Sequence, residues 1–293
     1  MTNSQTPLGQ ISIQQQLLQE FYPLIRECLF KSTVCINYEL INGDDINKFN
    51  FIELEEYYTN LINEDENKEE IDYLNYAAPI AVCGGAPRDW NIGKPASDID
   101  MYIAISNLSL NLMISLNNNL GKIKLKSLIN YIENYFVNKG FTKDVDFKIE
   151  SSTNNTKYVG TNYIDCVISF NYKGLEFDLI FIDIYKITNI SYFNNNELCN
   201  LQVSFNQANK TFGFSFNEFI TSTYDFNISK FSYDLNNNKI IPTYEGLKDI
   251  EDKTLTLNKH ISENSISRLK CSMFKHYPKL AKKFPDYKFI IQE

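Results

Sequence analysis

Apolar residues between positions 79 and 105 form two short runs with a polar, glycine-containing segment between them. The first run, 79–83, ends at Gly84-Gly85, which favours a buried strand followed by a tight turn. The second run, 97–105, alternates polar and apolar side chains, the pattern of a strand with one buried face. Pro87 suits an early helical position, where its missing N–H costs nothing. The segment therefore predicts a strand, a turn, a helix that begins near Pro87, and a second strand.

Other segments repeat apolar residues at intervals of three and four, the spacing of an amphipathic helix. One such segment covers residues 11–31, and a second covers residues 125–136 and ends at Lys139-Gly140, a typical helix cap. A weaker repeat covers residues 51–62. These segments predict helices that pack on a strand-containing core.

Two more apolar runs, 163–172 and 175–184, are joined by Lys173-Gly174 and predict a β-hairpin. The polar stretch 194–196 then predicts a loop, which we take as the boundary between a first domain and a C-terminal region. At 293 residues the chain is long enough for one large or two small domains.

Two carboxylates share a face of the strand predicted at 97–105. In a strand Asp98 and Asp100 lie about 7 Å apart, since alternate side chains point the same way. Carboxylates at that distance repel each other unless a cation lies between them, and hard divalent metals prefer oxygen ligands. Magnesium is therefore the expected ion, with manganese as the alternative.

The second strand of the predicted hairpin carries a further acidic pair, Glu176 and Asp178, opposite an apolar face. A buried acid is costly unless it pairs with a cation or binds a metal. Asp178 is therefore the candidate third metal ligand, and Glu176 is the second choice. In the alternative, Asp178 pairs with a buried cation such as Arg88.

The glycine pair predicts a phosphate-binding turn. Gly84 and Gly85 lack a Cβ, so backbone N–H groups there can come close to a ligand. Arg88 falls in the first turn of the helix that follows, where a guanidinium can bind phosphate oxygens in a bidentate manner. The alternative is a plain turn beside an exposed edge strand.

The ordered set of motifs resembles a known superfamily. Gly84-Gly85-Ala86, Arg88-Asp89, Gly93-Lys94-Pro95 and Asp98-Ile99-Asp100 stand in the order and spacing of the nucleotidyltransferases related to DNA polymerase beta. In this detail the chain is most similar to the CCA-adding enzymes and bacterial poly(A) polymerases. The resemblance implies an α/β (α+β) fold. It consists of a mixed-sheet nucleotidyltransferase head with N-terminal helices, residues 1–193, and a smaller, largely helical neck-like region, residues 194–293.

The resemblance also implies a site. Two metal ions, Mg²⁺ or Mn²⁺, would be held by Asp98, Asp100 and Asp178, and Gly84, Gly85 and Arg88 would seat a nucleoside triphosphate such as ATP. Farther along, residues 223–234 and 244–250 are similar to two later motifs, and 263–277 is similar to the neck helix, in which Arg268 would contact the base. Thr223-Tyr224 replaces paired arginines and Ser265 replaces an aspartate, so the base-selecting part departs from the family.

Transfer of a nucleoside monophosphate to an acceptor hydroxyl is the activity that this resemblance implies. The leading acceptor is an RNA (tRNA-like) 3′ end, and the alternatives are a protein or a small molecule. A different class of function is a catalytically silent nucleotide-binding or protein-interaction module on the same fold. Retention of the head motifs argues against the silent module, and loss of the base reader argues for it. Shortened, divergent chains of this kind also resemble phage- or virus-encoded members.

Net charge qualifies the choice of acceptor. The overall charge of −8 argues against a broad nucleic-acid footprint. After Asp252, however, nine basic residues face three acidic ones, which gives this end a charge of +6 and leaves −14 for the rest. The basic end could hold a polyanionic acceptor, or it could be a solvated helix face.

Cysteine spacing and hydropathy bear on the compartment. The six cysteines show no CxxC spacing, which predicts reduced thiols and neither a disulfide framework nor a zinc site. No apolar run approaches the ~20 residues of a membrane helix, and the first residues do not begin a signal peptide. We expect a cytoplasmic protein without a membrane partner, in the host cytoplasm if the gene is viral.

Overall fold

The computed structural model describes residues 7–42, 80–104, 119–151, 164–182, 216–258 and 266–292. The chain divides into two compact units. The larger contains residues 1–21, 79–106 and 143–293, and the smaller contains 22–78 and 107–142. The boundary expected at 193/194 and the apolar repeat at 51–62 lie outside the described residues.

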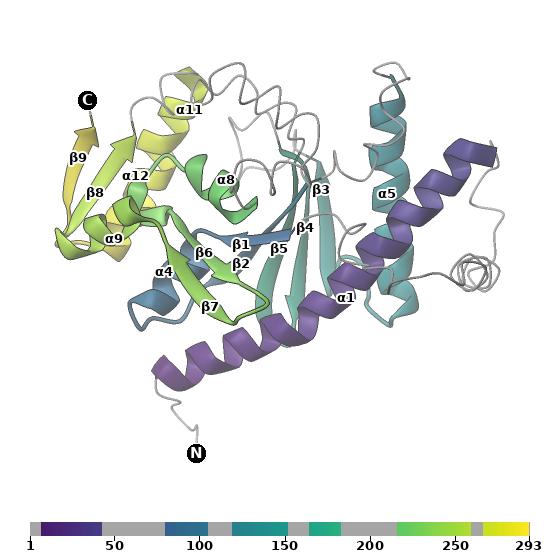
Figure 1. Ribbon diagram of the computed structural model, residues 1–293, viewed down its shortest axis with the longest axis horizontal. Helices are drawn as coiled ribbons and strands as arrows, with labels where there is room; N and C mark the ends of the chain where they lie inside the picture. The colour runs from purple at the N-terminus through teal and green to yellow at the C-terminus, as the bar shows by residue number, and fades with distance from the viewer. Residues whose placement is uncertain are drawn as a thin grey trace, which may run out of the picture. The chain divides into compact units, whose positions relative to one another are not determined.

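A seven-stranded mixed sheet organises the larger unit (Figure 1), with the strand order β3-β4-β5-β2-β1-β6-β7. The strands are β1 (Ile80–Cys83), β2 (Asp98–Ala104), β3 (Phe147–Ser151), β4 (Ile164–Tyr172), β5 (Leu175–Ile182), β6 (Phe231–Asp234) and β7 (Lys239–Pro242). β2 pairs with β5 in parallel, and the other neighbouring pairs are antiparallel. The mixed α/β fold predicted from the sequence is confirmed.

The C-terminal residues contribute strands as well as the expected helices. β6 pairs with β1 and so extends the main sheet, while β8 (Thr254–Asn258) and β9 (Lys288–Gln292) form a separate parallel pair (Figure 1). The described helices of this region are α8 (Phe216–Ser222), α9 (Tyr244–Glu251), α11 (Ile266–Cys271) and α12 (Tyr277–Lys283). A π-helical turn, Ser272–His276, joins α11 to α12, and a 3₁₀ turn covers Asn227–Ser229. The helix expected at 263–277 is present from Ile266 onward.

The hairpin predicted at Lys173-Gly174 is confirmed. Tyr172 of β4 lies opposite Leu175 of β5, which leaves a two-residue loop. Lys173 (φ 51°) and Gly174 (φ 85°) both have the positive φ that a type I′ turn requires. The turn fixes the register of β5 and thereby the positions of its acidic residues.

Helix α1 (Pro7–Asn42) extends beyond both ends of the predicted helix at 11–31. Its N-terminal part, up to Phe21, belongs to the larger unit. The fully buried Phe21 ring packs on the hairpin, with ring centroids 5.3 Å from Phe170 and 4.7 Å from Phe177. At the hairpin turn, Glu20 forms an exposed ion pair with Lys173 at 2.6 Å.

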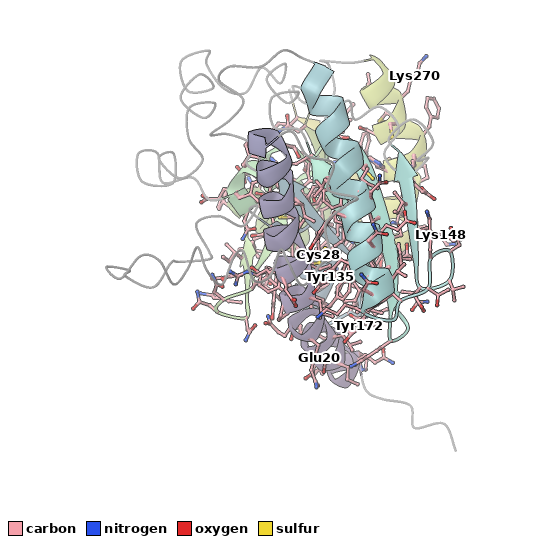
Figure 2. The ribbon with its side chains drawn as sticks, turned by 90° about the vertical axis from the view of Figure 1, so that its right-hand side faces the viewer. Glu20, Cys28, Tyr135, Lys148, Tyr172 and Lys270 are labelled. Atoms are coloured by element: carbon pink, nitrogen blue, oxygen red, sulfur yellow. The ribbon has the colours of Figure 1, made fainter. Side chains whose placement is uncertain are left out.

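The smaller unit contains the rest of α1 and helix α5 (Asn119–Asn138). Cys28 of α1 and Tyr135 of α5 are both buried and lie beside each other (Figure 2). Helix α5 ends at Asn138 and is followed by the predicted Lys139-Gly140 cap, in which Gly140 has a φ of 90° and the N–H of Phe141 donates to the carbonyl of Phe136.

Among the described residues, Cys28, Cys83, Cys166 and Cys271 form no disulfide. Among the described helices, none combines the length and apolar character needed to span a bilayer.

Candidate functional site

The parallel pairing of β2 with β5 gathers four carboxylates near the start of both strands. Asp98 lies in register with Glu176, and Asp100 lies in register with Asp178. Neighbouring side chains in register point to the same face of a sheet, so the two acidic pairs share one face. The residues between them, Ile99 and Phe177, are fully buried. The sequence predicts each pair separately, and the strand register brings the two pairs together.

Three of these acids form a cluster with the spacing of a cation site. One carboxylate oxygen each from Asp98, Glu176 and Asp178 lies within 4.8 Å of the others. Asp178 is fully buried, Asp98 is partly buried and Glu176 is exposed. Oxygens on opposite sides of Mg²⁺ are about 4.2 Å apart, and larger hard cations accept somewhat more. The all-oxygen donor set therefore fits a divalent cation after a small adjustment of the exposed glutamate.

Glu176 and Asp178, the two alternatives for the third carboxylate, thus both belong to the acidic cluster. Asp100 does not belong to that three-residue group, although it lines the pocket described below.

Strand β4 orients Asp178. The Ser169 hydroxyl lies in register with Asp178 and donates a hydrogen bond of 2.5 Å to its Oδ1. A buried carboxylate needs such a donor to offset lost hydration. Sequence reasoning did not select Ser169, but a hydroxyl residue inside an otherwise apolar strand was the available signal.

Gly84 forms the turn between β1 and helix α4 (Gly85–Asn91), which begins two residues before Pro87. Its φ of 92° and ψ of −124° form a combination that essentially only glycine adopts. Its N–H donates to the carbonyl of Phe231 at 2.8 Å, so this N–H serves the fold rather than a ligand. A Cβ on Gly84 would lie 2.8 Å from Oη of Tyr224 and 3.8 Å from Oδ2 of Asp100.

Substitution of Gly84 by alanine should lower the free energy of unfolding by about 3 kcal/mol or more, because backbone strain and a steric clash add together. Gly93→Ala is the matched control, since Gly93 has a φ of 73° but a Cβ added there would meet no atom within 4 Å. Urea unfolding of both variants gives the comparison. Adding Tyr224→Phe should recover part of the Gly84→Ala loss. Equal losses of unfolding free energy in Gly84→Ala and Gly93→Ala would contradict the expected steric clash at Gly84.

Arg88 and Asp89 form a buried ion pair. Nε and Nη2 of Arg88 each lie 2.9 Å from Oδ1 of Asp89, and Lys283 of α12 binds the other carboxylate oxygen. Arg88 is 5% exposed and Asp89 is 1% exposed. The guanidinium lies over the Phe284 ring, 5.2 Å from its centroid. The acid that pairs with Arg88 is therefore Asp89, and this pairing orients Arg88 at the pocket wall.

One pocket, with a cavity volume of about 270 Å³, is bordered by these elements. Strand β2 contributes Asp98 and Asp100 to its lining, the turn before α4 contributes Gly84, and the first residue of α4 contributes Gly85. From α4 and the helical segment 272–283 it receives the cations Arg88, Lys275, Lys279 and Lys283. Acidic and basic walls in one pocket suit a ligand that combines a metal ion with several phosphates.

Tyr224 and Tyr102 also border the pocket. The Tyr224 hydroxyl donates to the Tyr102 hydroxyl at 3.1 Å, and the two rings meet edge to face. Burial, with Tyr102, Cys83 and Asp100 nearby, raises the pKa of Tyr224 well above its usual value near 10. Tyr224 therefore contributes a neutral hydroxyl next to Gly84.

The remaining predicted site residue is Arg268, which lies in α11, with its side chain outside the described part. Ser265 also lies outside the described residues. Thr223, which replaces one of the arginines of the motif that the sequence resembles, is buried and donates to the carbonyl of Ile220 at 2.7 Å.

No known protein family matches the sequence, and no curated protein is significantly similar to it. Among solved structures, a CCA-adding enzyme complexed with ATP is 15% identical, with 73% of this chain and 35% of that chain covered and a TM-score of 0.35. The Thermotoga maritima CCA-adding enzyme complexed with tRNA is 13% identical (73% and 35% covered, TM-score 0.33). The Bacillus stearothermophilus CCA-adding enzyme in complex with CTP is 14% identical (72% and 36% covered, TM-score 0.33). The chain thus spans little more than a third of these structures, and a likeness this weak carries no functional conclusion.

Proposed function

We propose that this chain is a divalent-metal-dependent nucleotidyltransferase, which transfers a nucleoside monophosphate from a nucleoside triphosphate to an acceptor hydroxyl. The observation that carries the proposal is the set of four carboxylates on one face of β2 and β5, beside a pocket whose other wall is cationic. The glycine turn and the Asp-x-Asp strand that the sequence shares with the superfamily border the same pocket. The geometry and the motifs thus support one site.

The metal-binding part of the proposal concerns the acids. Asp98, Glu176 and Asp178 are expected to hold a divalent cation, Mg²⁺ or Mn²⁺, because their oxygens already lie within 4.8 Å. Asp100, which lines the pocket with Asp98, is expected to share a second ion. Metal ions bound there would neutralise triphosphate charge and make an acceptor hydroxyl more acidic. Asp178, oriented by Ser169, is expected to take the proton from the acceptor hydroxyl.

The phosphate-binding part concerns the cations. Lys275 and Lys279 are exposed residues of the pocket wall and are expected to contact the phosphates that are not transferred. Arg88 uses Nε and Nη2 toward Asp89, and a guanidinium has five N–H donors in all, so its outer edge can also face a phosphate. The ion pair with Asp89 would then hold Arg88 ready for the ligand.

The acceptor that we favour is an RNA 3′ end, because the lysines of the helical segment 272–283 give the acidic protein a local cationic surface. The second candidate function is a nucleotide-binding module without transfer. Buried Thr223, whose hydroxyl bonds to the backbone, favours this second candidate because it stands where the resembled motif has an arginine, and it offers no charge to a ligand.

The decisive experiment supplies each α-labelled nucleoside triphosphate with Mg²⁺ and, in separate reactions, total RNA, a protein extract or a metabolite extract. We expect label at RNA 3′ ends, and none when EDTA replaces Mg²⁺. Label found only in protein or metabolites would overturn the proposal that RNA is the acceptor, but the assignment as a nucleotidyltransferase would stand. Nucleotide binding without any labelled product would overturn the transferase in favour of the module.

Two lysines of one helix provide matched variants for the same assay. Lys279 borders the pocket, whereas Lys282, also exposed, does not. Lys279→Ala should raise the apparent KM for the nucleotide about tenfold, the loss of one charge-assisted phosphate contact. Lys282→Ala should leave this KM unchanged, and an equal effect of both would point to a diffuse charge effect.

A further inference from the structure

The π-helical turn brings together a thiol, an imidazole and a carboxylate. Cys271, the last residue of α11, has its Sγ 3.7 Å from Nε2 of His276, the last residue of the turn. The other imidazole nitrogen, Nδ1, lies 3.6 Å from Oδ2 of Asp225. π-Helical turns inside longer helices often occur at functional sites. Here the turn places residues five positions apart within contact distance.

Asp225 is held firmly in this arrangement. It is 8% exposed, the Ser272 hydroxyl donates to its Oδ2 at 2.5 Å, and its backbone carbonyl accepts from Asn258 at 2.7 Å. A carboxylate that faces Nδ1 favours the tautomer with the proton on Nδ1. Nε2 is then the basic nitrogen, and it is the one that faces Cys271.

His276 lies between the other two groups, with Cys271 at one ring nitrogen and Asp225 at the other, so the three do not surround a common point. Among the described residues, the acidic cluster is the only group of three such side chains whose ligand atoms all lie within 4.8 Å. A metal site would need ligand atoms that converge on one point. Proton transfer from the thiol to the imidazole needs only that the imidazole contacts the thiol on one side and the carboxylate on the other. Proton transfer is therefore the chemistry that this geometry supports.

We propose that Cys271 is an activated thiol and a site of reversible thiolation by low-molecular-weight disulfides. The thiol proton passes to Nε2 of His276, and the thiolate attacks one sulfur of the disulfide. A new S–S bond forms to Cys271 as the old one breaks, and the departing thiolate takes the proton. One disulfide is consumed and one is formed, so the reaction needs no further oxidant.

Its surroundings distinguish Cys271 from the other described cysteines. Cys28, Cys83 and Cys166 are at most 1% exposed, and burial raises the pKa of Cys83 well above its ordinary value. Cys271 is partly exposed, and the His276 side chain is 39% exposed, so a small reagent can reach the pair. Asp225 faces His276 at 3.6 Å, and the helical segment that carries the pair also contains Lys270, Lys275 and Lys279, of which Lys275 and Lys279 line the same pocket as His276. Such cations favour a thiolate.

Thiolation would also affect the candidate nucleotide pocket, and this consequence rests on the proposed function. His276 and Asp225 both line that pocket. A group attached to Cys271 removes the thiol hydrogen that faces His276 and adds bulk beside a residue of the pocket wall. We expect weaker nucleotide binding in the thiolated protein.

The thiol is tested by the rate of iodoacetamide alkylation at Cys271 between pH 5 and 9, resolved from the other cysteines by peptide mass spectrometry. At pH 6.5 we expect the rate to exceed that of free glutathione about fivefold, because an activated thiol is already partly ionised there. His276→Gln should shift the rise in rate toward the ordinary thiol value near 8.5. Phe274→Ala, at an 81% exposed position of the same turn, is the control that should change nothing.

A wild-type rate that rises only near pH 8.5 would overturn the activated thiol, whatever the variants do. The modification itself is tested with oxidised glutathione at pH 7, where we expect one adduct at Cys271 that dithiothreitol removes. An adduct elsewhere, or none, would overturn the modification site. An adduct at Cys271 with unchanged nucleotide affinity would overturn only the effect on the pocket. Failure of the unmodified protein to bind nucleotide would count against the proposed function instead.

Discussion

Replacement of Asp98 by asparagine is expected to lower the rate of nucleotide transfer about 1000-fold, equivalent to about 4 kcal/mol of transition-state stabilisation. Asp98 is the acid that belongs both to the carboxylate cluster and to the pocket lining. Asparagine keeps the volume but removes the charge that holds a cation. The turnover number at saturating nucleotide and Mg²⁺ is the measurement, and turnover like that of the wild type would contradict the metal assignment.

Unfolding measurements on the same variant separate catalysis from folding. The cluster places three carboxylates close together, and their mutual repulsion opposes folding when no cation is bound. Asp98→Asn should therefore keep or raise the melting temperature without metal, and it should reduce the stabilisation by Mg²⁺. A melting temperature well below that of the wild type would attribute the lost activity to the fold.

Asp100→Asn and Glu176→Gln distinguish the two possible sets of metal ligands. The family resemblance assigns Asp98, Asp100 and Asp178, whereas the closest oxygens belong to Asp98, Glu176 and Asp178. A larger loss in Asp100→Asn would favour the first set, and a larger loss in Glu176→Gln would favour the second.

The local parts of this site could be predicted because local rules determine them. Alternation along a strand places Asp98 with Asp100 and Glu176 with Asp178, and the Lys173-Gly174 loop predicts the hairpin. The parallel pairing of β2 with β5 could not be predicted, because it joins segments that are remote in the chain. That pairing brings the two acidic pairs onto one face and places Asp98, Glu176 and Asp178 in one cluster.

Two other features escaped sequence reasoning for physical reasons. β6 and β7 are only four residues long and flank an asparagine-rich turn, so their apolar pattern is too short to recognise. The Arg88–Asp89 pair was missed because adjacent helical residues do not normally face each other. Here the long arginine side chain folds back onto the neighbouring carboxylate, and Lys283 contacts it from α12, which is far away in the sequence.

Replacement of Asp89 by alanine is expected to lower the free energy of unfolding by about 3 to 5 kcal/mol, the usual cost of removing one partner from a buried ion pair. The variant would leave the 5% exposed Arg88 without the carboxylate that both its Nε and Nη2 contact, and Lys283 would lose the same partner. The variant would also remove the Asp89–Lys283 contact that joins α4 to α12 at the candidate pocket. Urea unfolding at neutral pH measures the loss.

The Glu20–Lys173 pair provides the matched control. Its side chains are 36% and 57% exposed, so water already solvates both charges, and Glu20→Ala should leave the free energy of unfolding unchanged within error. If Asp89→Ala is equally harmless, the Arg88–Asp89–Lys283 contacts do not stabilise the fold. If Asp89→Ala is destabilising but Asp89→Asn is not, hydrogen bonding rather than charge holds Arg88 at the pocket wall. A large loss in both variants would identify the charge of Asp89 as the stabilising feature, because asparagine keeps the side-chain volume and one acceptor oxygen but cannot neutralise two buried cations.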